Sequence, residues 1–597
     1  MLGLLGLKGT ARAAERDKMK HRTSAKAALT GLTLALLSSA GTIAQEPQTG
    51  GTLRVLGTAE VDRFDTVPPA TADTGSFFRA TTRQLINFAA STDTDEQIAP
   101  QADLADSVPV PTDEGLTYKF KLRQGANWDA PDGARQIVAA DVERGFMRLC
   151  NPFIAAPAVS YFEDLIVGFA DFCAGFAAVE PTVEAMKAYI EAGDVAGIET
   201  PSEDTIVFRL KYAANDFIYL LTLPVTTPAP IEVLDYLPDS PEYRDNYISS
   251  GPYTIESYVP DTQITLVRNP AWTAESDPLR KAYVDQIDVI AGVQPDAAMQ
   301  QLQSGDGDML YDINVPPVTV QMLTMQGDEK ISTLAEGASR MIWINTVSEN
   351  NDGALRNPLV RQALNYAVNK AAIVQQLGGP EFATPLNGIF PLGILGHHDF
   401  APYPTPNDQG DTAKARELLT EAGYPDGLSL KMPFRNAGNG AAEAQVLQAS
   451  LAEAGFEVEL VPTPASDFYP RLITNFENAQ NGVWDLVPSG WSPDWPGGAA
   501  RSIFQPQYTY DGTHGTFNFS DYNNDAANEV ADRALATSDL DEAATLWNEV
   551  DELVMANPPT VPLISQTTVL YHGAGVQNFL PYAAGGNGDW TNVWLSR

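Results

Sequence analysis

The sequence of 597 residues has few of the side chains that carry covalent or metal chemistry, with two cysteines and five histidines. It contains no G-x-S-x-G nucleophile turn, no H-E-x-x-H zinc helix and no G-x-x-x-x-G-K-[ST] phosphate loop. These absences argue against an enzyme, and in particular against a secreted hydrolase, which is the kind of enzyme to consider. They leave ligand binding as the kind of function to look for.

Two patterns still resemble enzyme chemistry. His397 and His398 precede Asp399 and could ligate a metal, but adjacent residues rarely face one centre, so a solvated loop is the preferred interpretation. Asp485 and Asp494 could act as the paired carboxylates of glycoside hydrolysis, which requires a defined separation that a sequence does not supply. We therefore assign no catalytic residue, no metal site and no cofactor.

Basic residues are also scarce. The chain has 37 Lys and Arg against 76 Asp and Glu, and its formal net charge is −39. So acidic a surface repels phosphate backbones and anionic lipid headgroups, which argues against nucleic acid and the membrane surface as partners. Solubility or a saline habitat explains this charge better than steering of cationic ligands.

No apolar stretch reaches the length of about 20 residues that a bilayer requires. The longest, residues 27–37, follows several basic residues and precedes a small-residue segment that ends at Ala44. This pattern predicts a signal peptide over residues 1–44, cleaved after Ala44, with Met19 as the expected start codon. Because no cysteine lies in or directly after the apolar run, a lipid anchor is not expected. The prediction is a soluble, monomeric protein of a Gram-negative periplasm, without a membrane anchor.

The two cysteines are Cys150 and Cys173. An even pair in an oxidising compartment can form a disulfide. Two buried thiols remain the alternative at this stage.

Period-two alternation marks strands in the first half of the chain. Residues 118–122 alternate apolar and basic side chains, and residues 253–258 and 263–268 form an expected hairpin. Beyond about residue 340, helical and strand patterns alternate instead. Asn357 and Pro358 suit the start of one helix that continues to Gly378.

A strand–helix–strand unit is expected further along, from a strand at 428–432, a helix at 441–454 and a strand at 456–461. Such a unit implies parallel strands and a right-handed crossover. The second half of the chain is therefore expected to be an α/β lobe.

The most informative segment is Gly-Trp-Ser-Pro-Asp-Trp-Pro at residues 490–496. A carboxylate at Asp494 between Trp491 and Trp495 suits a ligand with a positive charge, because aromatic walls lower the local dielectric and offer π-faces to a cation. Taken alone, the segment is equally compatible with a surface turn whose aspartate caps its own backbone.

The order of segments along the chain adds a resemblance. The sequence is similar to the family 5 extracellular solute-binding proteins of ABC importers, the dipeptide- and oligopeptide-binding class. The segments that carry the resemblance are residues 50–55, 116–125, 139–142, 251–253, 267–272, 356–364, 490–496, 546–547 and 558–563.

The resemblance implies a mixed α/β fold like that of periplasmic binding proteins, with two clasping lobes and a smaller inserted lobe. One lobe would comprise residues 45–88, 215–340 and 566–597, the inserted lobe residues 89–214, and the second clasping lobe residues 341–565. Two strands crossing between the lobes would form the hinge, and residues 341–345 and 566–571 look like those crossings.

The resemblance also implies a function: capture of a di- or oligopeptide and its delivery to an ABC permease, without catalysis. Asp494 matches the aspartate that pairs with a peptide's ammonium group, and Gly490, Trp491 and Ser492 match the strand that pairs with its backbone. Trp495 flanks the same site. Gly497 and Gly498 depart from the family's usual aspartate and proline. Arg435 is a candidate for the peptide carboxylate by position, and a nickel chelate, an opine or an oligosaccharide is the alternative ligand.

Overall fold

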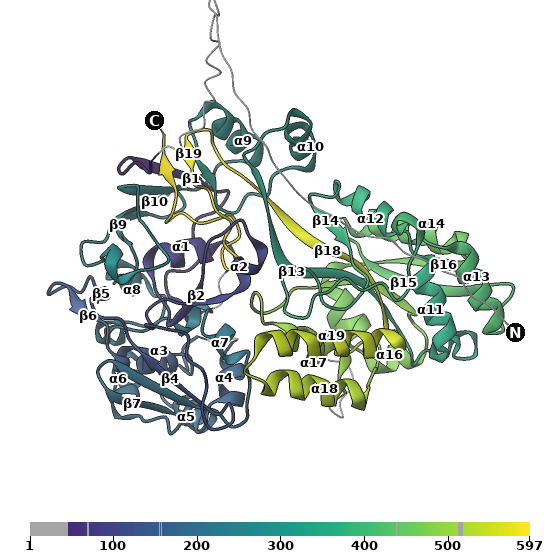
Figure 1. Ribbon diagram of the computed structural model, residues 1–597, viewed down its shortest axis with the longest axis horizontal. Helices are drawn as coiled ribbons and strands as arrows, with labels where there is room; N and C mark the ends of the chain where they lie inside the picture. The colour runs from purple at the N-terminus through teal and green to yellow at the C-terminus, as the bar shows by residue number, and fades with distance from the viewer. Residues whose placement is uncertain are drawn as a thin grey trace, which may run out of the picture. The chain divides into compact units, whose positions relative to one another are not determined.

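The computed structural model describes residues 46–68, 71–154, 156, 158–437, 439–510 and 517–596 (Figure 1). The expected signal peptide, its cleavage site and Met19 lie outside the described residues. The described part is a mixed α/β structure with several sheets, so this prediction is confirmed. No helix in that part is long and apolar enough to span a membrane.

A five-stranded sheet contains the first strand of the described chain. Its strand order is β12-β1-β11-β10-β9. The strands are β1 (Thr52–Leu56), β9 (Tyr253–Val259), β10 (Gln263–Arg268), β11 (Gln286–Ile290) and β12 (Met309–Leu310). β9 and β10 are antiparallel, which confirms the predicted hairpin, whereas β1 is parallel to β11 and β12. Leu53 and Val55 of β1 share a buried core with Val576 and Leu595 from the C-terminal end of the chain.

A three-stranded antiparallel sheet, β4-β8-β7, lies in the segment between the first strands and residue 210. It consists of β4 (Thr117–Lys121), β7 (Ile198–Ser202) and β8 (Thr205–Arg209). The predicted alternation holds in β4, where Tyr118 and Phe120 are buried and Lys119 and Lys121 are exposed. The helices α3 (Ala139–Arg148), α4 (Val159–Leu165), α5 (Phe169–Phe176) and α6 (Val183–Ala192) accompany this sheet.

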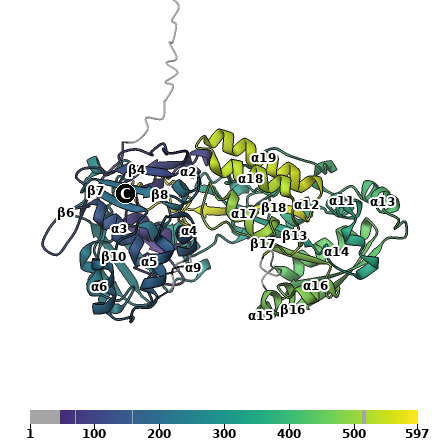
Figure 2. The same ribbon diagram turned by 90° about the horizontal axis from the view of Figure 1, so that it is seen from below.

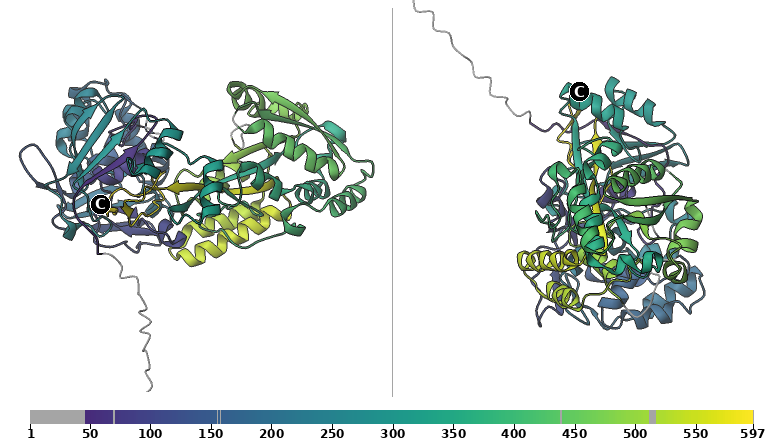
Figure 3. Two further views of the ribbon diagram at one scale, coloured as in Figure 1. Left: turned by 90° about the horizontal axis from the view of Figure 1, so that it is seen from above. Right: turned by 90° about the vertical axis from the view of Figure 1, so that its right-hand side faces the viewer.

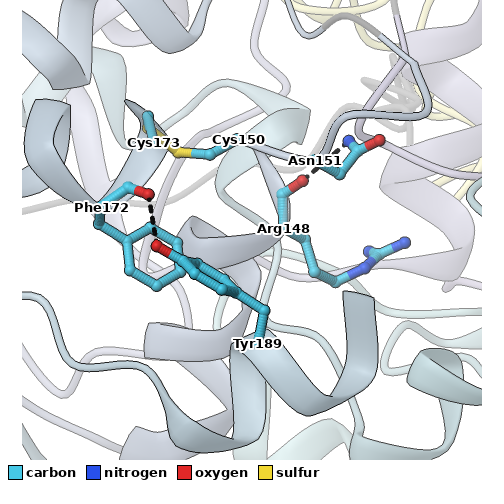
Figure 4. Close-up of a disulfide and its surroundings, with 6 residues drawn as sticks. All are labelled: Arg148, Cys150, Asn151, Phe172, Cys173 and Tyr189. Carbon is cyan, nitrogen blue, oxygen red and sulfur yellow. Dashed lines mark hydrogen bonds between the residues drawn. A yellow bond between two sulfur atoms is a disulfide. The ribbon is translucent and has the colours of Figure 1, made fainter. Parts of the chain in front are cut away.

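The structure joins Cys150, which follows α3, to Cys173 of α5 by a disulfide (Figure 4). The bond closes a separation of 23 residues. Beside it, the Tyr189 hydroxyl donates a hydrogen bond to the Phe172 carbonyl at 3.0 Å. The disulfide therefore ties two helices of one aromatic core together.

Two long strands dominate a four-stranded sheet of order β14-β18-β13-β17. β13 (Ile331–Ile344) and β18 (Thr560–Tyr571) run antiparallel side by side, from the pair Ile331 and Tyr571 to the pair Trp343 and Thr560 (Figure 1). The edge strands are β14 (Ala383–Pro385) and β17 (Leu486–Trp491). The segments predicted as crossings, 341–345 and 566–571, lie near opposite ends of this pair; the first extends one residue beyond β13, and the second is only part of β18.

The predicted strand–helix–strand unit is confirmed. β15 (Leu428–Arg435) and β16 (Phe456–Thr463) are parallel and are connected by α14 (Gly440–Glu453). The single helix expected from residue 358 to 378 is wrong. Two helices occur, α11 (Pro358–Ala367) and α12 (Lys370–Leu377), because Asn369 accepts a hydrogen bond from the Ala372 backbone N–H and starts a new helix.

Three helices follow residues 490–496 near the end of the chain. They are α17 (Ala500–Tyr508), α18 (Asp525–Ala536) and α19 (Leu540–Ala556), and α18 lies beside α19 in Figures 2 and 3. Their buried side chains, including Ile503 and Trp547, belong to the same core cluster as Phe146 and Phe208 near the three-stranded sheet. This shared core brings residues 490–501 next to α4 and to α7 (Phe217–Leu220).

Candidate functional site

The predicted segment begins on a sheet edge. β17 is the last strand of the four-stranded sheet, and it pairs with β13 on one side only, with Trp491 opposite Ser339 and Gly490 opposite Arg340. Its other edge forms no strand ladder among the described residues, although β15 lies beside it and the Asp485 N–H, just before β17, donates to the Lys431 carbonyl oxygen at 2.9 Å. Such an edge can accept the backbone of an extended ligand as an additional strand. Pro488 and Pro493 limit which amides of this segment can donate.

Asp494 lies in the turn between β17 and α17. Its backbone N–H donates to Ser502 Oγ at 3.3 Å, which fixes the turn to the first residues of the helix. Its carboxylate, which keeps a solvent-exposed side, accepts a short hydrogen bond from the Tyr161 hydroxyl of α4. Partial burial raises the pKa of Asp494, and the hydrogen bond from Tyr161 opposes that shift. No described Lys, Arg or His forms an ion pair with this carboxylate.

A buried ion pair lies next to the contact between Tyr161 and Asp494. Arg501 Nε of α17 lies 2.7 Å from Asp216 Oδ2, and the two side chains are 6% and 1% exposed. The Arg501 guanidinium is also 5.9 Å from the centre of the Tyr161 ring. Burial alone would lower the pKa of Arg501, but Asp216 raises it above its usual value. Arg501 therefore places a fixed positive charge beside the phenol that contacts Asp494.

Sequence reasoning missed Tyr161, Asp216 and Arg501. Tyr161 is separated from Asp494 by 333 positions, and no pattern in either segment indicates the contact. Only the fold brings α4 and the turn at Asp494 together. Asp216 occupies the N-cap position of α7. An acidic residue there was the one local signal for a functional role, and it is equally compatible with an ordinary helix start.

The two tryptophans have different surroundings. Trp495 is 1% exposed and packs edge-on against Tyr161, with 4.9 Å between the ring centres. Trp491 is half-buried and packs edge-on against Phe517 at 5.1 Å. Neither indole N–H finds an acceptor among the described residues. The structure thus buries one indole against Tyr161 and leaves the other partly accessible.

Two cavities meet at Ser492. The polar cavity, of about 210 Å³, is lined by Arg340, Phe434, Arg435, Gly440, Glu443, Tyr469, Pro488, Ser489, Gly490, Trp491, Ser492 and Gln566. The apolar cavity, of about 460 Å³, is lined by residues 66–68, 71, 72, 75, 78, 158, 223–225, 338, 492–496 and 583–586. Asp494 belongs to the second, and its volume is in the range of small-ligand sites.

Arg435 lies in the polar cavity, in the same lining as Gly490 and Trp491. Its guanidinium is 5.9 Å from the centre of the Tyr469 ring, and no carboxylate of the described residues forms an ion pair with it. The neighbouring Arg340 instead pairs with Glu443 through a bond of 2.7 Å from Nε to Oε1. One arginine of this cavity is therefore neutralised within the protein, and the other is not.

The departure from the family pattern at Gly497 and Gly498 has a steric basis. Gly497 has a φ of +74°, and a Cβ there would lie 2.8 Å from the Ile98 carbonyl oxygen. A Cβ on Gly498 would lie 2.2 Å from the Tyr219 ring. Glycine is required at both positions because Tyr219 packs directly against the backbone.

The other sequence candidates are dispersed. Asp485 is buried just before β17, at the opposite end of the strand from Asp494, where it accepts hydrogen bonds from Ser348 Oγ and the Lys431 N–H. His397 Nδ1 lies 2.8 Å from the Phe390 carbonyl oxygen, and the His398 ring stacks on Phe400. No group of three or more metal-binding side chains occurs among the described residues.

A free strand edge, a carboxylate without a cation and two cavities together define a binding protein for small solutes. The family described as bacterial extracellular solute-binding proteins, family 5, matches residues 99–513. The chain belongs to this family.

The relatives agree with this assignment. The glutathione-binding protein GsiB of Salmonella typhi is 25% identical over 470 residues, which is 78% of this chain and 81% of that protein. Among solved structures, the clavulanic acid biosynthesis oligopeptide binding protein 2 has a TM-score of 0.76 at 25% identity and covers 92% of this chain and 96% of its own. The Helicobacter pylori protein DppA in complex with the peptide STSA has a TM-score of 0.60 at 22% identity, with 92% and 99% covered, and shares the fold. The predicted family and fold are confirmed.

Proposed function

We propose that this protein is a periplasmic receptor that binds short peptides and presents them to the permease of an ABC importer, without catalysing a reaction. One observation carries the proposal: Asp494 is a carboxylate with a raised pKa, at the end of a free strand edge, whose described partner is a neutral phenol. A bound ammonium group would supply the missing cation, and the edge of β17 would pair with the peptide backbone. One relative is named as a glutathione-binding protein, and one solved structure is named as a complex with a peptide. These names support peptides as the ligand class.

Arg435 would take the opposite charge of the ligand. It lines the polar cavity next to Gly490 and has no internal ion pair among the described residues, so a ligand carboxylate can bind there without displacing a protein group. Ser492 lies between the two cavities and would face the middle of the ligand.

Lobe closure would complete the site. We infer the lobes to be residues 45–88, 215–340 and 566–597 on one side, with 89–214 inserted, and residues 341–565 on the other. The strands β13 and β18 would serve as the hinge, which is consistent with their long pairing. The solute would then be carried through the periplasm to the permease, as the predicted export signal and the family imply.

The test combines a substitution with a chemical change of the ligand. We expect Asp494→Ala to weaken binding of the tripeptide Phe-Ala-Ala by about 30-fold. Removing one partner of a buried charge pair costs at least about 2 kcal/mol of binding free energy, which corresponds to this factor. N-acetylation of the tripeptide should cause a similar loss in the native protein and little further loss in the variant, since both changes remove one interaction. Isothermal titration calorimetry measures both.

The matched control is Asp532→Ala, which removes an exposed carboxylate on α18 and should leave affinity unchanged. Additive losses from the substitution and acetylation would show that Asp494 does not bind the ammonium group. If no member of a panel of di- and tripeptides binds, the peptide proposal itself is wrong, and native mass spectrometry of the purified protein would identify a co-purified ligand of another class.

A further inference from the structure

The residues that line the apolar cavity favour some ligand side chains over others. Among the described residues of its lining, Asp494 is the only ionisable side chain, and the others are aliphatic, aromatic, alanine, glycine, proline, serine or threonine. Leu223, Val225, Ala583 and Ala584 are half-buried there, so part of their apolar surface faces the cavity. Covering such surface with an apolar group is favourable by about 25 cal/mol per Å².

The far wall of this cavity is held in a fixed position. Helix α1 (Thr74–Thr81) packs so closely on residues 583–586 that a Cβ on Gly75 would lie 1.7 Å from the Ala584 carbonyl oxygen. A Cβ on Gly585 would lie 2.6 Å from Ser76 Oγ. The wall therefore cannot move toward α1, and the small side chains along it preserve the open volume.

We propose that this cavity receives the side chain of the ligand's first residue and selects peptides that begin with a large apolar residue. The inference rests on the proposed function, because it takes Asp494 as the ammonium anchor. In a peptide the ammonium group and the first side chain share one α-carbon. Fixing the ammonium group at Asp494, which lines the cavity, thus brings that side chain to the apolar walls.

A charged first side chain is disfavoured in this position. It would lose water without gaining a partner, since the lining offers no ionisable group except the occupied Asp494. An acidic side chain would also be repelled by Asp494 itself. The polar cavity has the opposite character, with Arg340, Arg435, Glu443 and Gln566 in its lining. Selectivity is therefore expected at the first residue, with polar and charged groups tolerated further along the ligand.

Calorimetry with three tripeptides tests the inference directly. We expect Phe-Ala-Ala to bind at least about tenfold more tightly than Ala-Ala-Ala, because the cavity removes a large apolar side chain from water; tenfold corresponds to about 1.4 kcal/mol. Asp-Ala-Ala should bind most weakly. Equal affinities for all three would overturn the inference and leave the peptide function intact, whereas no binding of any of them would contradict the proposed function itself.

Two substitutions assign the preference to this cavity. Ala72→Trp, at an exposed lining position, should fill the cavity and weaken Phe-Ala-Ala at least tenfold while leaving Ala-Ala-Ala nearly unchanged. Val225→Asp places a carboxylate in the wall and should make Lys-Ala-Ala bind more tightly than Phe-Ala-Ala. Ala192→Trp, on the exposed end of α6, is the matched control and should change neither affinity. Equal weakening of both peptides by Ala72→Trp would contradict the inference.

Discussion

Asp216 and Asp494 are two carboxylates placed around the same pair of side chains, Tyr161 and Arg501. Asp216 is 1% exposed and lies 2.7 Å from Arg501. Asp494 keeps an exposed side. Among the described residues, its carboxylate accepts a hydrogen bond only from the Tyr161 hydroxyl. The difference separates two roles: a carboxylate neutralised inside the protein maintains the fold, and one left without a cation is available to a charged ligand.

The same rule holds elsewhere in the chain. Asp103 and Asp277 are fully buried and pair with Arg83 and Arg280, whose side chains are also 0% exposed. These four side chains join residues that are far apart in the sequence, and none of them lines the polar or the apolar cavity. Full internal pairing again marks a structural group.

The largest effect is expected from breaking the internal pair. Arg501→Met should lower the free energy of unfolding by about 3–5 kcal/mol, because it leaves Asp216 buried and without its cation. Urea unfolding followed by circular dichroism measures the loss. The double variant Arg501→Met, Asp216→Asn should recover part of it, since no buried charge then remains unpaired.

Arg533→Met removes an exposed arginine of α18 and serves as the control, with an expected change within about 0.5 kcal/mol. If Arg501→Met were as mild as this control, Asp216 would not depend on Arg501, and the distinction between the two carboxylates would fail.

The second effect concerns the charge on Asp494. Its pKa in the folded protein is raised above the ordinary value of 3.8, so the carboxylate takes up a proton at a higher pH than a free aspartate does. Ammonium binding requires the ionised form. Affinity for Phe-Ala-Ala should therefore be complete above this pKa and fall about tenfold per pH unit below it.

Calorimetry between pH 7 and pH 4 should show this decline in the native protein, while Asp494→Asn should bind weakly and with little dependence on pH. The peptide's own ammonium group, with a pKa of about 7.7–8.0, stays charged over this interval and does not contribute. A decline of equal steepness in Asp494→Asn would assign the pH dependence to another group.

Much of the fold followed from local patterns, and the site followed from them only in part. The hairpin β9–β10, the alternation in β4 and the unit β15–α14–β16 depend on periodicity within short segments. The break at Asn369 was missed because both helices have apolar faces in register and only a side-chain cap separates them. Asp494 and the end of β17 were proposed as site residues from one continuous segment. Tyr161, Asp216 and the wall at residues 583–586 were not, because they meet the site through contacts that span hundreds of positions.

The smallest effect tests Tyr161, the one described hydrogen-bond partner of the Asp494 carboxylate. Because the Tyr161 hydrogen bond lowers the pKa of Asp494 against the effect of burial, Tyr161→Phe should raise that pKa and move the midpoint of the pH-dependent binding to higher pH. A hydrogen bond to a charged group contributes about 1.5–3 kcal/mol, and the exposed side of Asp494 reduces this, so the shift should be about one pH unit or less. Tyr212→Phe is the matched control, because that phenol donates to Asp164 and does not touch Asp494. An unchanged midpoint in Tyr161→Phe, or an equal shift in Tyr212→Phe, would mean that the phenol does not set the charge of Asp494 and that Asp494 differs from Asp216 by the missing cation alone.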